Sequence, residues 1–275
     1  MGASIARIAK TRGLARQIIG VDSDVHTRDL VRERGWVDLV WGAPNVQCGK
    51  ADMIIVATPV SSVPSTLTLL SPWHEPGTVI TEIAGVKSQI QSELTALPER
   101  MQAWIGGSHP LCGPERSGPL ASRSDLFAGS PCLIVPYRRT ARAVLPLLKN
   151  FWRQLGCHTF VHVTPSRHDQ WMAHISHLPH VIAWALTQTT ESASSKNTAL
   201  KKMTGPSFRD ATRVAASSPK LWAEIFRTNR RELRTAIEAL RRELAQVSKR
   251  LNQSTPRDLI KWIEQASRCH GRFGS

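Results

Sequence analysis

The feature that most constrains the fold is an alternation of short apolar runs and helical stretches that fills the first 164 residues. The apolar runs predict strands at Gln17–Val21, Met53–Ala57, Thr78–Ile83, Ala103–Ile105, Cys132–Val135 and His158–Val163. Helical spacing marks the segments Ile5–Thr11, Thr27–Gly35, Val63–Leu70, Gln89–Leu97 and Ala141–Leu155. Such alternation is typical of an α/β fold with a doubly wound, mostly parallel sheet.

From about Pro165 the strand signals vanish, and residues 165–275 are predicted to form a separate helical domain. Ser218-Pro219 has the pattern of a helix start. Spacings of four and three then join a stripe of apolar residues: Leu233, Ile237, Leu240, Leu244, Val247 and Leu251. The stripe fits a helix packed within its own domain, but its length and narrowness favour a helix of a second subunit. A shorter helix is predicted over residues 254–268.

Composition narrows the class of protein. The 275 residues suffice for two modest domains, and the hydrophobic content of 41% is ordinary. No apolar run approaches the length of a membrane span, and the start at Met1-Gly2-Ala3-Ser4 has no signal-peptide pattern. Five scattered cysteines, an odd number without paired spacing, predict neither a zinc site nor a disulfide framework. We therefore expect a cytoplasmic protein without a membrane or metal partner.

The formal net charge of +15 permits three interpretations. It fits nucleic-acid binding, it fits solvated basic helix faces such as residues 230–250, and it fits a positive field that attracts small anions. No nucleic-acid motif is present and no aromatic residues alternate with the basic ones, so we expect no nucleic-acid partner.

The segment Gly107–Gly118 contains the first candidate catalytic residue, His109. The histidine follows the apolar run Ala103–Ile105 and has glycines and a proline around it, which predicts a rigid loop at the carboxyl edge of the sheet. Ligands bind at that edge in open α/β sheets, and histidine is a common base near neutral pH. A single loop histidine is nevertheless more often a surface or packing residue.

Two later segments, Ser176–His180 and Ser207–Arg213, make the catalytic interpretation stronger. Together with the His109 segment, and in the same order, they resemble motifs of the prephenate/arogenate dehydrogenase family, and the resemblance runs from Met1 to about Leu251. It implies a Rossmann-type NAD-binding domain over residues 1–164. It also implies a helical substrate and dimerisation domain over residues 165–275, which favours a homodimer.

The resemblance implies a reaction of tyrosine biosynthesis, the oxidative decarboxylation of prephenate to 4-hydroxyphenylpyruvate with hydride transfer to NAD. His109 would take the proton of the ring hydroxyl, and arginine suits the two substrate carboxylates because it pairs with them bidentately. The residues that match substrate-site positions of the family are Glu115, Ser176, His180, Arg209, Asp210, Arg213 and Trp222. For Trp222 a core position is equally plausible, an Arg-Asp-Arg set is often a surface cluster, and His177 is expected to be structural.

Four residues are expected to bind NAD. Gly2 matches the last glycine of the dinucleotide fingerprint, and Asp22 lies the usual ~20 residues beyond it, where an acid binds the ribose hydroxyls and disfavours NADP. An ordinary turn residue is the other interpretation of Asp22. By resemblance, Thr58 and Pro59 contact the nicotinamide side of the cofactor through their backbone.

Two departures from the family pattern keep alternatives open. The start lacks the first strand and the first two glycines of the fingerprint, so either the true start lies upstream of Met1 or the chain is a non-catalytic remnant. Gly85 stands where the family usually has serine, which could impair activity or indicate another substrate, such as arogenate or a similar acid.

Overall fold

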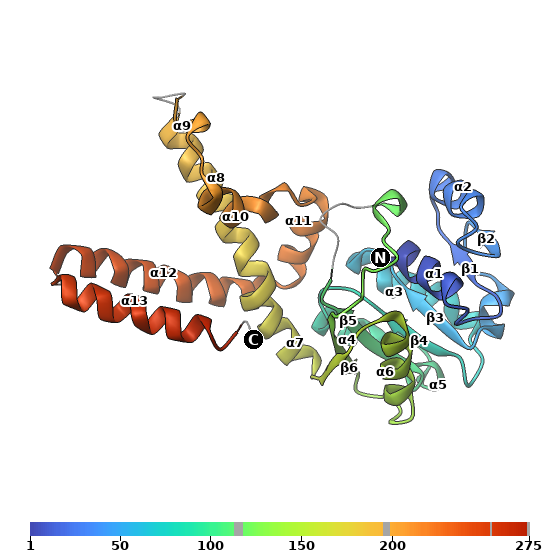
Figure 1. The fold of residues 1–275 in the computed structure, drawn as a ribbon. Helices are drawn as coiled ribbons and strands as arrows, with labels where there is room; N and C mark the ends of the chain where they lie inside the picture. The colour runs from blue at the N-terminus through green and yellow to red at the C-terminus, as the bar shows by residue number, and fades with distance from the viewer. Residues whose placement is uncertain (113–117, 195–198, 254, 274–275) are drawn as a thin grey trace. The chain divides into compact units, whose positions relative to one another are not determined.

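The computed structural model describes residues 1–112, 118–194, 199–253 and 255–273. The chain forms two compact units, Met1–Arg230 and Arg231–Ser275. The first unit contains the α/β part and a series of helices that follows it, whereas the second consists of helices in the residues described (Figure 1).

The α/β part is built on a five-stranded sheet in the order β3-β4-β5-β6-β7. Its strands are β3 (Met53–Val56), β4 (Val79–Glu82), β5 (Ile105–Pro110), β6 (Pro131–Pro136) and β7 (Thr159–His162). Only the β5–β6 pair is antiparallel. A separate parallel pair joins β1 (Ile19–Val21) to β2 (Leu39–Trp41). The mostly parallel sheet confirms the predicted fold class, and β2 is an additional strand that the sequence did not predict.

Helices cover both faces of the five-stranded sheet. They are α1 (Gly2–Thr11), α3 (Val63–Leu70), α4 (Ser88–Glu93), α5 (Glu99–Gln102) and α6 (Val144–Leu155), whereas α2 (Val25–Glu33) packs against β1 and β2. In β4 the successive residues Val79 and Ile80 belong to different hydrophobic clusters, because neighbouring strand residues point to opposite faces. The Ile80 cluster packs against α3 and α4, and the Val79 cluster packs against α1 and α6.

Helix α6 illustrates how the sequence sets these layers. Val144, Leu148, Trp152 and Leu155 recur at helical spacing on one face, and all four are buried. Gly156 ends the helix in the left-handed conformation, with φ of 113°, which a residue with a side chain rarely adopts. The predicted helix Ala141–Leu155 is thus confirmed with a later start.

The strand that carries His109 corrects one sequence prediction. The run Ala103–Ile105 was expected to be the strand and His109 to lie in a loop beyond it, but β5 extends from Ile105 to Pro110 and includes His109. Glycines permit this central strand to pack closely. A Cβ at Gly106 would lie 2.7 Å from Leu148 Cδ1, and one at Gly107 would lie 2.8 Å from Glu82 Oε1.

The first unit continues through a series of helices after β7. These are α7 (Pro165–Met172), a π-helical turn (Ala173–His177), α8 (Leu178–Ser194), α9 (Ala199–Lys202), α10 (Pro206–Thr212) and α11 (Pro219–Thr228). Helix α7 begins after Thr164, whose hydroxyl accepts from the backbone N–H of Arg167, and Pro165 occupies its first turn. No helix among the described residues is long and apolar enough to cross a membrane.

The second unit contains the stripe predicted at residues 233–251. Helix α12 (Arg230–Gln253) runs beside α13 (Pro256–His270), which starts with a capping box between Thr255 and Asp258 (Figure 1). Within the stripe Leu233 is buried, whereas Ile237, Leu244 and Leu251 are 37, 59 and 68% exposed. The helices are as predicted, and a large part of the stripe faces outward in a single chain.

Candidate active site

Strand register brings the predicted residues of the α/β part to one edge of the sheet. Val56 at the end of β3 pairs with Glu82 of β4, which pairs with Gly107 of β5. His109 lies two residues beyond Gly107, and Thr58 lies two residues beyond Val56. Both therefore lie at the carboxyl ends of parallel strands, the edge where open α/β sheets bind ligands.

The predicted cofactor residues lie near the ends of β1 and β3. Gly2 opens α1 so close to β3 that a Cβ there would be 3.2 Å from the Cβ of Ala57. Asp22 follows β1, is exposed, and its Oδ1 accepts from the backbone N–H of Asp24 at 2.9 Å. Thr58 and Pro59 are exposed after β3. A tight glycine contact at the helix start and an exposed acid after the next strand fit the needs of a dinucleotide.

His109 is partly buried, and its ring is held by a second histidine. Its Nδ1 lies 2.8 Å from Nε2 of His168, and the two ring centroids are 5.0 Å apart. Burial, and then the positive charges that His168 and Lys87 can carry, hold the pKa of His109 well below its usual value. The imidazole is therefore neutral at pH 7, the form that can accept a proton.

Behind His109 lies a buried acid that sequence reasoning missed. Asp169 Oδ1 lies 2.8 Å from Nδ1 of His168 and accepts from the backbone N–H of Lys87 at 2.9 Å. Its Oδ2 accepts from the backbone N–H of Ser88 at 2.8 Å. Burial alone would raise the pKa of Asp169, but the hydrogen bonds from His168 and Ser88 leave it below the ordinary value. Asp169 is thus ionised, and it ties α7 to the start of α4.

A second missed group is an ion pair beneath the strand that carries His109. Lys87 Nζ donates to Glu82 Oε1 at 2.5 Å and to the carbonyl of Ser108 at 2.8 Å, and both charged side chains are fully buried. The hydroxyl of Tyr137 also donates to Glu82 Oε1, at 2.5 Å. Because each charge has a partner, the pair tolerates its burial and fixes the backbone next to His109.

The helical part of the first unit presents the second group of predicted residues. The ring of His180 stacks on Trp222 with centroids 3.5 Å apart. Its Nδ1 donates to the carbonyl of Ser176 at 2.9 Å, and Ser217 Oγ lies 3.4 Å from its Nε2. Burial first, and also the charge of Arg213, lower the pKa of His180. The structure thus brings His180, Trp222 and Arg213 together.

The other predicted substrate residues lie at the margin of this group. Arg209 and Asp210 are exposed on α10, and Arg213 opens the 3₁₀ turn Arg213–Ala216 directly after that helix. Ser176 contributes its backbone carbonyl to the bond with His180. Glu115 lies outside the described residues. These assignments stay predictions.

His177 and Asn229 connect the two groups. Asn229 Nδ2 donates to the backbone carbonyl of Asp169 at 2.8 Å and lies 3.2 Å from Nδ1 of His177. The His177 ring packs edge-on against Trp222, with centroids 5.9 Å apart. A continuous set of contacts therefore runs from His109 to Trp222, and the buried position of His177 agrees with the structural role expected for it.

Gly85, which stands where serine was expected from the resemblance, lies next to His109. A Cβ built on Gly85 would be 3.9 Å from Cε1 of His109, an ordinary contact distance. A serine could stand there without steric conflict.

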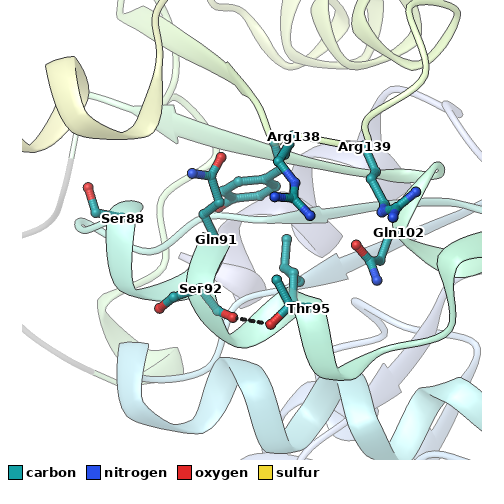
Figure 2. A pocket seen from close by; sticks show the side chains of 9 residues that line it. Ser88, Gln91, Ser92, Thr95, Gln102, Arg138 and Arg139 are labelled. Atoms are coloured by element: carbon teal, nitrogen blue, oxygen red, sulfur yellow. Dashed lines mark hydrogen bonds between the residues drawn. The ribbon is translucent and has the colours of Figure 1, made fainter.

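A hollow of about 230 Å³ opens elsewhere on the α/β part (Figure 2). Its wall is formed by Ser88, Gln91, Ser92, Leu94, Thr95, Gln102, Tyr137, Arg138 and Arg139. None of these residues is among those predicted to bind substrate or NAD. The hollow meets the site through Tyr137, which donates to Glu82, and through Ser88, whose backbone N–H donates to Asp169. Since His109 does not line it, we do not assign the reaction to it.

Comparison with known proteins gives two family models that together match most of the chain. Residues 5–161 match a model described as the nucleotide-binding domain of prephenate dehydrogenase, and residues 164–265 match its dimerization domain.

Curated relatives and solved structures agree with these models. Prephenate dehydrogenase of Bacillus subtilis is 28% identical over 97% of this chain and 71% of the relative. Cyclohexadienyl dehydrogenase of Zymomonas mobilis is 30% identical over 83% of this chain and 78% of the relative. The structure of prephenate dehydrogenase from Aquifex aeolicus with hydroxyphenyl propionate and NAD⁺ superposes with a TM-score of 0.89 at 25% identity, and it covers 99% of this chain and 94% of that one.

Proposed function

Because the chain belongs to the prephenate dehydrogenase family, we propose that His109 is the base of an NAD-dependent oxidative decarboxylation of prephenate to 4-hydroxyphenylpyruvate, a step of tyrosine biosynthesis. Bound NAD supplies the hydride acceptor for the ring carbon that bears the hydroxyl. As the hydride leaves, His109 accepts the hydroxyl proton. The electrons of the broken bond to the carboxylate enter the ring, carbon dioxide departs, and the ring becomes aromatic. No proton is released overall, so His109 returns its proton to the ring oxygen.

Arg213, His180 and Trp222 form the substrate-binding group in this proposal. Arg213 pairs with a substrate carboxylate, since a guanidinium presents two parallel N–H donors to it. The lowered pKa of His180, caused by burial and by Arg213, supports a cation close to that ring. The flat stack of His180 on Trp222 supplies a rigid, mostly apolar wall for the ring of the substrate. Around this group we place the remaining candidates, Ser176, Arg209, Asp210 and Glu115.

Cofactor binding is assigned to the start of α1 and the ends of β1 and β3. The backbone at Gly2 approaches the pyrophosphate, and the tight contact that a Cβ there would make with Ala57, at 3.2 Å, supports a preference for glycine at this helix start. Asp22 binds the ribose hydroxyls. Thr58 and Pro59 line the nicotinamide side through their backbone.

The domain assignment and the oligomer are part of the same proposal. We assign residues 1–164 to NAD binding, and residues 165–275 to substrate binding and dimerisation. The exposed apolar residues Ile237, Leu244 and Leu251 on α12 support a homodimer, since a second copy would cover them. We place the enzyme in the cytoplasm and propose no nucleic-acid or membrane partner.

The observation that carries the proposal is His109, a neutral imidazole at the carboxyl edge of the sheet. The test measures NADH formation and carbon dioxide release by the wild type and by His109→Asn, with prephenate and, separately, arogenate. His162→Asn, an exposed histidine on β7, is the matched control. We expect equal NADH and carbon dioxide from prephenate, a fall in turnover of about 10²–10⁴ in His109→Asn, and no change in the control.

Two outcomes would overturn the proposal. A wild type that forms no NADH with prephenate is not a prephenate dehydrogenase, and a faster reaction with arogenate would reassign its substrate. A folded His109→Asn that turns over like the wild type would remove the catalytic role of this residue.

A further inference from the structure

The structure assigns a positioning role to His168 and Asp169: they hold His109 as the Nδ1–H tautomer, so that its Nε2 is free to take the substrate proton. This inference rests on the proposed role of His109 as the base. It concerns two residues of α7 that lie 59 and 60 positions from His109 in the sequence.

Asp169, the buried acid, determines which atom donates in each hydrogen bond between it and His109. Asp169 is ionised and accepts at both oxygens, so the bond of 2.8 Å to Nδ1 of His168 requires a proton on that nitrogen. Burial lowers the pKa of His168, which is therefore neutral and carries a single ring proton. Its Nε2 is consequently a hydrogen-bond acceptor.

The hydrogen bond between His168 and His109 then determines the tautomer of His109. Nε2 of His168 has a lone pair and lies 2.8 Å from Nδ1 of His109, so Nδ1 of His109 must donate. A neutral His109 then has no proton on Nε2, the atom that can accept one from a substrate hydroxyl. The opposite tautomer would place two lone pairs face to face and occupy Nε2 with a proton.

The two positioning residues are themselves held firmly. His168 is fully buried, and Asp169 is 2% exposed. Backbone N–H groups of Lys87 and Ser88 fix both carboxylate oxygens of Asp169, and Asn229 donates to its carbonyl. The chain of bonds therefore starts from the backbone at the start of α4 and ends at His109, which limits rotation of the catalytic ring.

The same bonds can share the charge that forms during the reaction. When Nε2 of His109 has taken the hydroxyl proton, the Nδ1 proton can move across the bond to Nε2 of His168. The positive charge then lies on His168 beside the Asp169 carboxylate, and the reverse shift restores both rings when the proton returns to the ring oxygen. Burial and Lys87 oppose a positive charge on either ring, whereas the hydrogen bond and the negative charge of Asp169 favour it at His168.

The residue at position 85 makes the hydrogen bond between His109 and His168 more important in this protein. Gly85 is the residue beside Cε1 of His109, and it has no side chain that could donate or accept a hydrogen bond. The side-chain hydrogen bond that the structure gives His109 is the one that its Nδ1 donates to Nε2 of His168.

The first test reads the tautomer directly. Nitrogen-15 NMR of the histidine-labelled wild type, with His109 assigned by comparison with His109→Asn, should show a protonated Nδ1 and an unprotonated Nε2. This measurement needs no altered fold and no activity. A wild-type His109 that carries its proton on Nε2 would overturn the inference.

The second test uses a matched pair of variants. His168→Asn keeps an amide near the Nδ1 position, where it can still bind Asp169 but cannot reach His109. His168→Gln extends an amide towards the Nε2 position, where its oxygen can accept from His109. We expect His168→Asn to lose the Nδ1–H tautomer and about 10²-fold or more in kcat, with KM for prephenate nearly unchanged. His168→Gln should restore the tautomer and most of kcat.

The exposed His174→Asn on the adjacent turn is the control and should behave as the wild type in both assays. Equal kcat in His168→Asn and the wild type, or a loss in His168→Gln as large as in His168→Asn, would contradict a positioning role. The two proposals fail differently. Absence of prephenate oxidation by the wild type would remove the proposed function, while the tautomer measurement would still decide the inference about His168.

Discussion

Replacing His177 with asparagine should flatten the dependence of stability on pH between about pH 6.5 and 4. Burial, above all, lowers the pKa of His177 from 6.5 to about 4 in the folded protein. Its Nδ1 faces the amide donor of Asn229 at 3.2 Å, so a proton on that nitrogen would set two donors against each other. His177→Asn keeps an amide oxygen that can accept from Asn229 but has no group that titrates in this range.

The magnitude follows from the two pKa values. The unfolded chain takes up a proton near pH 6.5, and the folded chain does so only near pH 4. Between these values the unfolded state binds more protons, so the free energy of unfolding falls as the pH falls. A separation of about 2.5 units at ~1.4 kcal/mol per unit corresponds to about 3 kcal/mol from this residue. The loss of the ring packed on Trp222 adds a destabilisation that is the same at every pH.

Urea unfolding of the wild type and of His177→Asn at a series of pH values from 8 to 4 separates the two effects. The difference between the proteins should be largest near pH 7 and shrink by about 3 kcal/mol at pH 4. His174→Asn, an exposed histidine in the same π-helical turn, should leave the pH dependence unchanged. A difference between wild type and His177→Asn that is constant over this range would refute the reasoning.

Three further predictions concern the cofactor, the substrate and the dimer. Asp22→Ser should reduce the preference for NAD over NADP by about 10-fold or more, as measured by fluorescence titration with both cofactors, because a charged hydrogen bond to the ribose is lost; an unchanged ratio would remove the assigned role. Arg213→Ala should mainly raise KM for prephenate, by about 10- to 100-fold, because a hydrogen bond to a charged carboxylate is lost. Arg227→Ala, at another exposed arginine, should not raise it, and a fall in kcat alone would contradict carboxylate binding. Charges at both Leu240 and Leu244 should give a monomer by light scattering, and a persistent folded dimer would exclude this face of α12.

The sequence predicted the layers of the fold because apolar spacing is a local signal. Helix α6 and the strands β3, β4, β6 and β7 were each anticipated within a few residues. Strand β5 was misplaced because Gly106, Gly107 and Pro110 have low strand propensity. Only pairing fixes them in the sheet: Gly106 and Gly107 pair with both β4 and β6, and Pro110 pairs with β6. Strand β2 has only three residues and lies in the short run Trp36–Trp41, which is apolar except for Asp38, so the sequence did contain a signal for it that was missed.

The sequence predicted only those residues of the candidate site that lie in recognisable motifs. His109, His180 and Arg213 stand in recognisable segments, but no spacing rule connects His168 to a residue 59 positions away. A usable signal was the adjacent His168-Asp169 pair in the helix that Thr164-Pro165 starts, because two polar residues on a buried helix face need partners. The buried Lys87 also depends on tertiary contacts alone, since its partner Glu82 becomes visible only when the strands are paired.

The most direct test of His109 as a neutral base is the pH dependence of kcat/KM for prephenate in the wild type and in His109→Asn. A base must be unprotonated to act, and the pKa of His109 lies well below 6.5 because the ring is buried near His168 and Lys87. The wild type should therefore keep its full kcat/KM down through pH 6.5 and lose it only at lower pH. His109→Asn should show a low value without that acid limb. An acid limb centred at or above pH 6.5, or the same limb in His109→Asn, would contradict the assignment of His109 as the base.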